Sequence, residues 1–160
     1  MSVLSRQWIE LNENSLGLQP GGLLIRGLAA VILNIGDAVN IDAAGKVDKS
    51  ATAGEQVSKM GVVVGGESTN MNPYTADTQV GDEAAGVGEM VLVCILGIAH
   101  VITEDNTLDA IGEPFAQGTS VAGKVVAAAN LAGATAMDFI LEVDGTPAAD
   151  NHLKAFITQA

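Results

Sequence analysis

The longest apolar run of the chain extends from Met90 to Ile98, where every residue except Gly97 is apolar. Val, Ile and Leu predominate in it, and β-branched residues together with a central glycine favour a strand over a helix. In a strand, the run presents two apolar faces, with Val91, Val93 and Ile95 on one and Met90, Leu92, Cys94 and Leu96 on the other. Both faces must be covered. We therefore expect the domain's own core on one side and another subunit or a host surface on the other.

Shorter apolar runs on either side predict further strands, separated by turns rich in Gly, Asn and Asp. We expect these strands at residues 23–35, 38–41, 46–48, 60–64, 121–129 and 137–143, with a hairpin turn at 43–45. Residues 67–80 are polar and predict a long loop. Near the end, Asp150 can cap a short helix that places Leu153, Phe156 and Ile157 on one face.

The organisation expected from this pattern is one β domain with an extension at each end. A length of 160 residues fits a single domain. Residues 1–20 are polar, contain the only Trp and lead into Pro20-Gly21-Gly22, which predicts an N-terminal arm. The β domain then spans 21–145, and 146–160 form a short C-terminal tail. Within the arm, Trp8, Ile9 and Leu11 are the expected partner contacts, because Trp is enriched among interface hot spots.

The composition supports an all-β fold. Apolar residues make up 48% of the chain, but aromatic residues only 3%, so the core must consist of Val, Ile, Leu and Ala. The 19 glycines are too many for a helical domain, because each glycine inside a helix costs about 0.5–1 kcal/mol relative to Ala.

The charge of the chain narrows the choice of partners. The formal net charge is −12, and no basic residue lies between Lys59 and Lys124. A chain of this charge is repelled by nucleic acid and by anionic membrane surfaces, so we expect neither as a partner. The acidic residues either keep the protein soluble or cover the outward side of an assembly.

One segment has the spacing of a phosphate-binding loop but lacks part of its chemistry. Gly118 and Gly123-Lys124 match the pattern Gly-x4-Gly-Lys, whereas Val125 stands where a Ser or Thr would bind Mg²⁺. No strong helix pattern follows whose N-terminus could hold a phosphate. We therefore interpret the segment as a turn between two strands.

The remaining reactive residues do not form a catalytic or metal-binding pattern. His100 and His152 have no Cys, Asp or Glu at zinc-ligand spacing. Cys94 is the only cysteine, so the chain forms no internal disulfide, and its apolar run is typical of a buried structural thiol. We expect no enzyme activity and no cofactor, and synthesis in a reducing cytoplasm.

The order of several short motifs resembles one known family. These motifs are Gly-Asp-Ala-Val (36–39), Ala-Gly-Lys-Val (44–47), Met-Gly-Val-Val-Val-Gly (60–65), Gly-Asp-Glu (81–83), the run at 89–99 and Ala-Gly-Lys-Val-Val (122–126). Over residues 23–143 the chain is similar to the small cement, or head-decoration, proteins of tailed bacteriophages.

The resemblance implies a compact β-barrel or β-tulip domain that assembles mostly as homotrimers on the outer surface of the virion capsid. Members occupy three-fold and quasi-three-fold positions, engage the major capsid protein through a terminal arm, and reinforce the shell. They have no catalytic residues. With this assembly, the expected subunit interface contains Leu92, Cys94, Leu96 and Ile98.

The main alternative is a β-barrel adaptor or a carrier-type binding module without catalysis. Residues 122–126 are similar to a biotinyl-type hairpin, although Lys124 follows Gly123 instead of the Met of a Met-Lys turn. A β-fold hydrolase is a third possibility, for which the sequence offers no catalytic constellation.

Overall fold

The computed structural model describes residues 22–50, 61–73, 80–104, 108, 111–118, 120–127, 138–143 and 152–157. These residues form a mostly β fold, without an α-helix among them and with a single 3-10 turn, η2 (Glu67–Thr69). The strands are β1 (Gly22–Leu28), β2 (Leu33–Asn34), β3 (Ala38–Ile41), β4 (Val47–Lys49), β5 (Gly61–Gly66), β6 (Glu83–Ala85), β7 (Met90–Ile102), β8 (Pro114–Gln117), β9 (Val125–Ala127), β10 (Asp138–Val143) and β11 (His152–Ile157). The expectation of a β-rich fold is thereby confirmed for the described residues.

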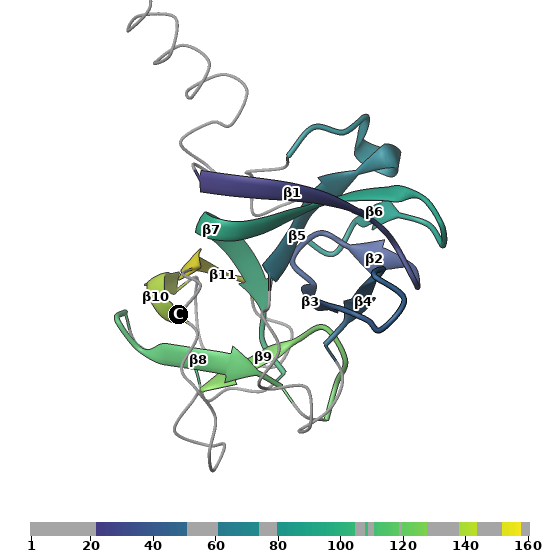
Figure 1. Cartoon of the computed structure of the whole chain (residues 1–160). Coiled ribbons are helices and arrows are strands. Elements are labelled where there is room, and N and C mark those ends of the chain that lie inside the picture. Colours follow the sequence, from purple (N-terminus) through teal and green to yellow (C-terminus); the bar gives the residue numbers. More distant parts are fainter. Residues whose placement is uncertain are drawn as a thin grey trace, which may run out of the picture.

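The long strand β7 organises the main sheet. It pairs antiparallel with β1, β5 and β11, and the sheet as a whole has the order β4-β3-β5-β7-β11-β10-β8-β9, with β1 attached to β7 (Figure 1). The short strands β2 and β6 form a second, two-stranded antiparallel sheet. The predicted run at 90–98 is therefore the central strand, and it continues to Ile102.

The described strands do not close into a barrel, although the two ends of the sheet order meet at one point. The Gly123 amide, just before β9, donates a hydrogen bond of 2.9 Å to the Ser50 carbonyl, just after β4. The Ala38 amide donates one of 2.7 Å to the Gly123 carbonyl. These bonds join the ends of the sheet without forming a ladder between β4 and β9.

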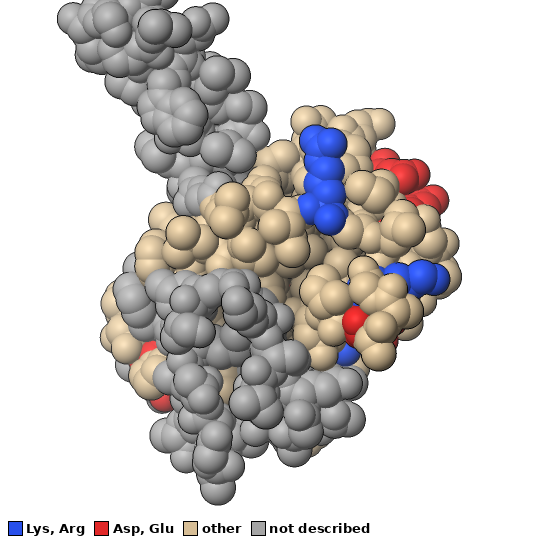
Figure 2. Space-filling view, viewed as in Figure 1, with Lys and Arg blue, Asp and Glu red and all other residues tan. Residues whose placement is uncertain are grey.

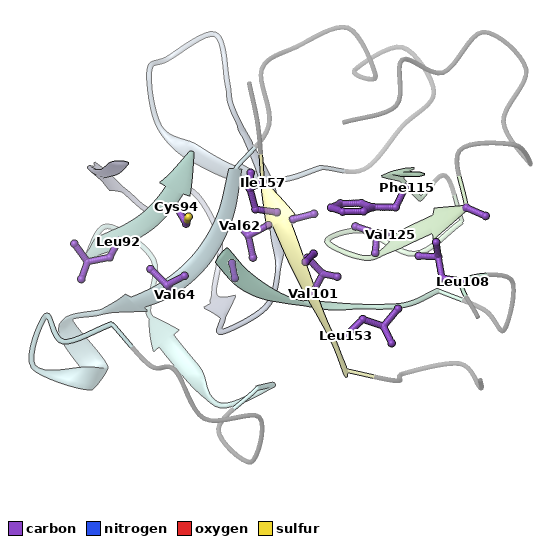
Figure 3. Packing of buried hydrophobic residues seen from close by; sticks show 14 residues of the cluster. Val62, Val64, Leu92, Cys94, Val101, Leu108, Phe115, Val125, Leu153 and Ile157 are labelled. Atoms are coloured by element: carbon purple, nitrogen blue, oxygen red, sulfur yellow. The ribbon is translucent and has the colours of Figure 1, made fainter. Parts of the chain in front are cut away.

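Two apolar clusters lie on opposite faces of β7. One contains Leu92 and Cys94 together with residues of β5, β8, β9 and β11 (Figure 3). The other contains Val91 and Val93 together with residues such as Leu33 and Val47. The two-sided burial predicted for this strand is confirmed over residues 91–94, but the chain itself supplies the cover on both faces. A second subunit is not needed there.

A β-bulge divides β7 into two halves. Leu24 pairs with Cys94 and Leu23 with Leu96, which leaves Ile95 as the extra residue, and Gly97 follows with a φ of 127°. A bulge shifts the alternation of side chains by one residue. The face that begins with Leu92 and Cys94 accordingly continues with Ala99 and Val101 in the same cluster, not with Leu96 and Ile98.

Several predicted elements agree with the structure. The strand at 38–41 is β3, and the turn at 43–45 joins it to β4 as a hairpin, with Gly45 at a φ of 78°. The predicted strand at 23–35 is interrupted after Leu28. The Ala29 amide still donates to the Glu89 carbonyl opposite it, but the Ala30 amide donates to the Val47 carbonyl and so leaves the β1–β7 ladder. Strand β2 lies at the end of the predicted 23–35 strand, whereas β6 and β8 were not predicted.

The helix predicted after Asp150 is wrong. Residues 152–157 form β11, which pairs with β7 from His152 opposite Ile102 to Ile157 opposite Gly97. Leu153, Ala155 and Ile157 alternate into the core. The segment predicted as a C-terminal tail at 146–160 therefore contributes a strand to the main sheet.

Candidate interaction surface

Strand β1 offers a sheet edge for interaction. Among the described residues it pairs with β7 alone, in an antiparallel ladder from Leu28 opposite Met90 to Gly22 opposite Gly97 that is interrupted by the bulge at Ile95. In the described part of the chain, no strand pairs with its other edge. The main-chain N–H and C=O groups of a sheet edge can bind an added strand.

Two leucines make the start of this strand apolar and exposed. Leu23 is 56% exposed and Leu96 is 44% exposed, and the two are direct partners across the ladder. Side chains opposite one another on neighbouring strands lie about 5 Å apart, so they form one apolar surface. We call strand β1, which carries Leu23, together with Leu96 of β7 the β1 edge surface. Its strand β1 follows the predicted arm, residues 1–20, in the sequence.

The β1 edge surface carries little charge. Arg26 is the only charged residue of β1 and is exposed. In Figure 2 the surface over β1 is mostly uncharged, with a basic side chain projecting from it, whereas acidic side chains gather towards β6. Glu67, Asp82 and Glu83 near that strand are all exposed. In a chain with a net charge of −12, a face of low charge repels an acidic partner less than the acidic surface near β6 does.

The residues predicted at the subunit interface separate into two groups. Leu92 and Cys94 are buried inside the domain, which removes the reason for placing them at an interface. Leu96 is exposed on the β1 edge surface, and Ile98 is half-buried opposite Phe156 of β11. The bulge at Ile95 causes this separation. Sequence reasoning missed Leu23, although its position directly after Pro20-Gly21-Gly22 marks it as the first apolar residue of the domain.

The predicted arm contacts Trp8, Ile9 and Leu11 lie outside the described residues. The first described residue after the predicted arm is Gly22. It begins β1 and pairs with Gly97, next to the exposed pair Leu23 and Leu96.

The loop with phosphate-loop spacing already holds an anion from the same chain. The Ser120 amide lies 3.1 Å from both carboxylate oxygens of Glu104, and the Val121 amide lies 3.2 Å from Oε2. The loop is closed by the Gly118 amide, which donates to the Lys124 carbonyl at 2.7 Å. It joins β8 to β9, as predicted for a turn between strands.

An ion pair between the half-buried Lys49 and the buried Asp37 lies where the ends of the sheet meet. Asp37 is buried, and its Oδ2 accepts a hydrogen bond from the Asn34 amide at 2.8 Å and lies 3.1 Å from Lys49 Nζ. Burial raises the pKa of the Asp37 carboxyl above its ordinary value, with the Asn34 amide and the charges of Lys49 and Lys124 acting in the opposite direction. The pair joins β4 to the turn before β3, which is a structural role.

The described residues contain no cluster of three or more His, Cys, Asp or Glu side chains arranged to hold a metal ion. His100 lies in β7 opposite Lys154, and His152 begins β11. Among the same residues, no helix is long and apolar enough to cross a membrane. No protein-family model matches the chain, and none of the curated proteins matches it.

Proposed function

We propose that this protein is a non-catalytic cement protein of a tailed-bacteriophage head, which binds the major capsid protein on the outer surface of the shell. The observation that carries the proposal is the β1 edge surface. It combines a sheet edge with which no described strand pairs, an exposed leucine pair and low charge, and it follows the predicted arm in the sequence.

Such a surface suits a protein partner that is already assembled. A strand edge supplies main-chain hydrogen bonds, and apolar side chains beside it supply burial and selectivity. The arm adds Trp8, Ile9 and Leu11, whose large apolar side chains give a contact beyond the domain itself. Arm and edge surface are consecutive in the chain, so both can engage one partner at the same time.

The proposed assembly is a homotrimer at three-fold or quasi-three-fold positions, built on a compact barrel-like or tulip-like domain. Of the residues predicted at the subunit interface, Ile98 remains available to a neighbouring subunit, because it is only half-buried, whereas Leu96 belongs to the β1 edge surface that we assign to the capsid protein. The acidic surface near β6 is then suited to face solvent, where charge keeps decorated heads apart.

The test is decoration of purified, undecorated phage heads by the recombinant protein, followed by sedimentation and electron microscopy. Removing residues 1–18 should leave a folded domain that no longer decorates heads, and Trp8→Ala should weaken decoration at least about tenfold. Circular dichroism of both variants checks that the domain is folded. A folded truncated protein that still saturates heads at the wild-type concentration contradicts the proposal.

The same recombinant protein can be used to distinguish a cement protein from the carrier-type alternative. A carrier module is expected to be a monomer with a covalent group on Lys124, whereas a cement protein is unmodified and adds to heads. Intact mass spectrometry and gel filtration distinguish these two outcomes directly.

A further inference from the structure

The loop from Gly118 to Lys124 directs main-chain amides towards a single carboxylate. The Ser120 amide approaches both oxygens of Glu104 at 3.1 Å, and the Val121 amide approaches Oε2 at 3.2 Å. Gly118 leaves the space for this carboxylate, because a Cβ at that position would collide with Glu104 Oε2. The loop therefore provides two N–H donors for the carboxylate and leaves space for it at Gly118.

Successive amides that converge on one point form an anion-binding nest, the arrangement that also holds phosphate in nucleotide-binding proteins. Hydrogen bonds from amides to a charged oxygen are about twice as strong as those between neutral groups. The loop thus retains the physical basis of an anion site, although Val125 replaces the residue that would bind a metal.

We propose that this loop is an anion-binding nest whose ligand is the chain's own Glu104. Glu104 excludes external carboxylate and phosphate from the nest and fixes the conformation of the loop. The proposal concerns the domain alone and does not rest on the function proposed above.

The position of Glu104 gives this contact a structural consequence. Its amide donates to the Val125 carbonyl at 2.8 Å, directly after Thr103 forms a parallel bridge with Val125. The far side of the loop is Gly123, which bonds to Ala38 and Ser50 at the other end of the sheet order. Glu104 therefore links the end of β7 to the loop that joins the two ends of the sheet.

The test uses the full chain with Glu104→Ala, and Glu83→Ala as the matched control. Glu83 is exposed and Glu104 half-buried, and the hydrogen bond described for the Glu83 carboxylate comes from the Ser68 hydroxyl at 3.3 Å. Thermal unfolding is followed in sodium chloride, formate and inorganic phosphate at one ionic strength. Glu104→Ala should lower the melting temperature, and formate or phosphate should restore it with a saturable dependence on concentration.

Neither the wild type nor Glu83→Ala should show a saturable response, because the nest is filled in both. An unchanged melting temperature in Glu104→Ala, or an equal response to the anions in all three proteins, overturns the proposal. If Glu104→Ala does not fold, amide hydrogen exchange in Glu104→Gln tests the proposal instead. The amides of Ser120 and Val121 should exchange at least about tenfold faster in Glu104→Gln than in the wild type, and equal rates overturn the proposal.

Discussion

Replacing the exposed leucine pair of the β1 edge surface should weaken binding to phage heads without weakening the fold. The variant is Leu23→Thr combined with Leu96→Thr, because threonine has a β-branched side chain that suits a strand and lacks most of the apolar surface of leucine. Both leucines are partly exposed, and substitutions at surface positions usually change stability by within about 0.5 kcal/mol. The free energy of unfolding should therefore stay close to that of the wild type.

The expected loss of binding follows from the exposed area. Leu23 is 56% exposed and Leu96 is 44% exposed, which together equal the surface of about one whole leucine. Burying one leucine side chain contributes about 1.5–3 kcal/mol. If the partner covers both leucines, the double variant should bind heads with a dissociation constant about 10- to 150-fold higher, and each single variant should account for roughly half of that free energy.

The assay is titration of undecorated heads with labelled protein. Val87→Thr is the control, because Val87 is 66% exposed but lies in the turn between β6 and β7 and not on the β1 edge surface. It should bind heads as the wild type does. If the double variant is folded and binds heads within about threefold of the wild type, or if Val87→Thr loses as much affinity, the assignment of the surface is wrong.

Two further predictions concern the junction between the ends of the sheet. Gly123→Ala should destabilise the domain by more than Gly45→Ala. Both positions have a positive φ, of 83° and 78°, so both variants share a backbone strain of about 1–2 kcal/mol. Only at Gly123 would the added Cβ also lie 2.9 Å from Asp37 Oδ1. Urea denaturation of the two variants measures the difference, and equal losses contradict the contact. The second variant is Asp37→Asn, which removes the titrating carboxyl group. Because the pKa of Asp37 is raised in the native wild type, the native protein keeps this proton to higher pH than the unfolded chain does. The stability of the wild type should therefore fall relative to that of the variant as the pH rises from about 4 through the raised pKa. Denaturation over this pH range tests the sign, and a difference that is independent of pH contradicts it.

The sequence pattern was sufficient to predict an element where that element depends on interactions between nearby residues. The hairpin at 38–49 was predicted because its turn is stabilised nearby, with the Asp42 carboxylate accepting hydrogen bonds of 2.8 Å from the amides of Ala44 and Lys46. The central strand was also predicted, because its apolar residues are consecutive. The bulge at Ile95 was not, since a run that is apolar on both faces gives no signal when the alternation shifts by one residue.

The features that the sequence did not predict depend on contacts between residues that are distant in the chain. Leu153 and Ile157 are spaced as in an amphipathic helix, but Leu153, Ala155 and Ile157 also alternate as in a strand, and pairing with β7 selects the strand. The ion pair of Asp37 and Lys49 and the contact between Glu104 and the loop at 118–124 join residues that are distant in sequence. No spacing rule could have identified these partners.

The central position of β7 also determines how the chain can reach its native state. Its pairings join residues separated in the sequence by 50 positions, from Ile102 to His152, and by 75 positions, from Gly22 to Gly97. Domains dominated by such distant contacts fold slowly, in about milliseconds to seconds, because long loops must close before the contacts stabilise them. A growing chain cannot complete the pairing of β7 until β11 has been synthesised. Until then the apolar edge of β7 is open to aggregation, and chains shortened before His152 should accumulate as insoluble protein.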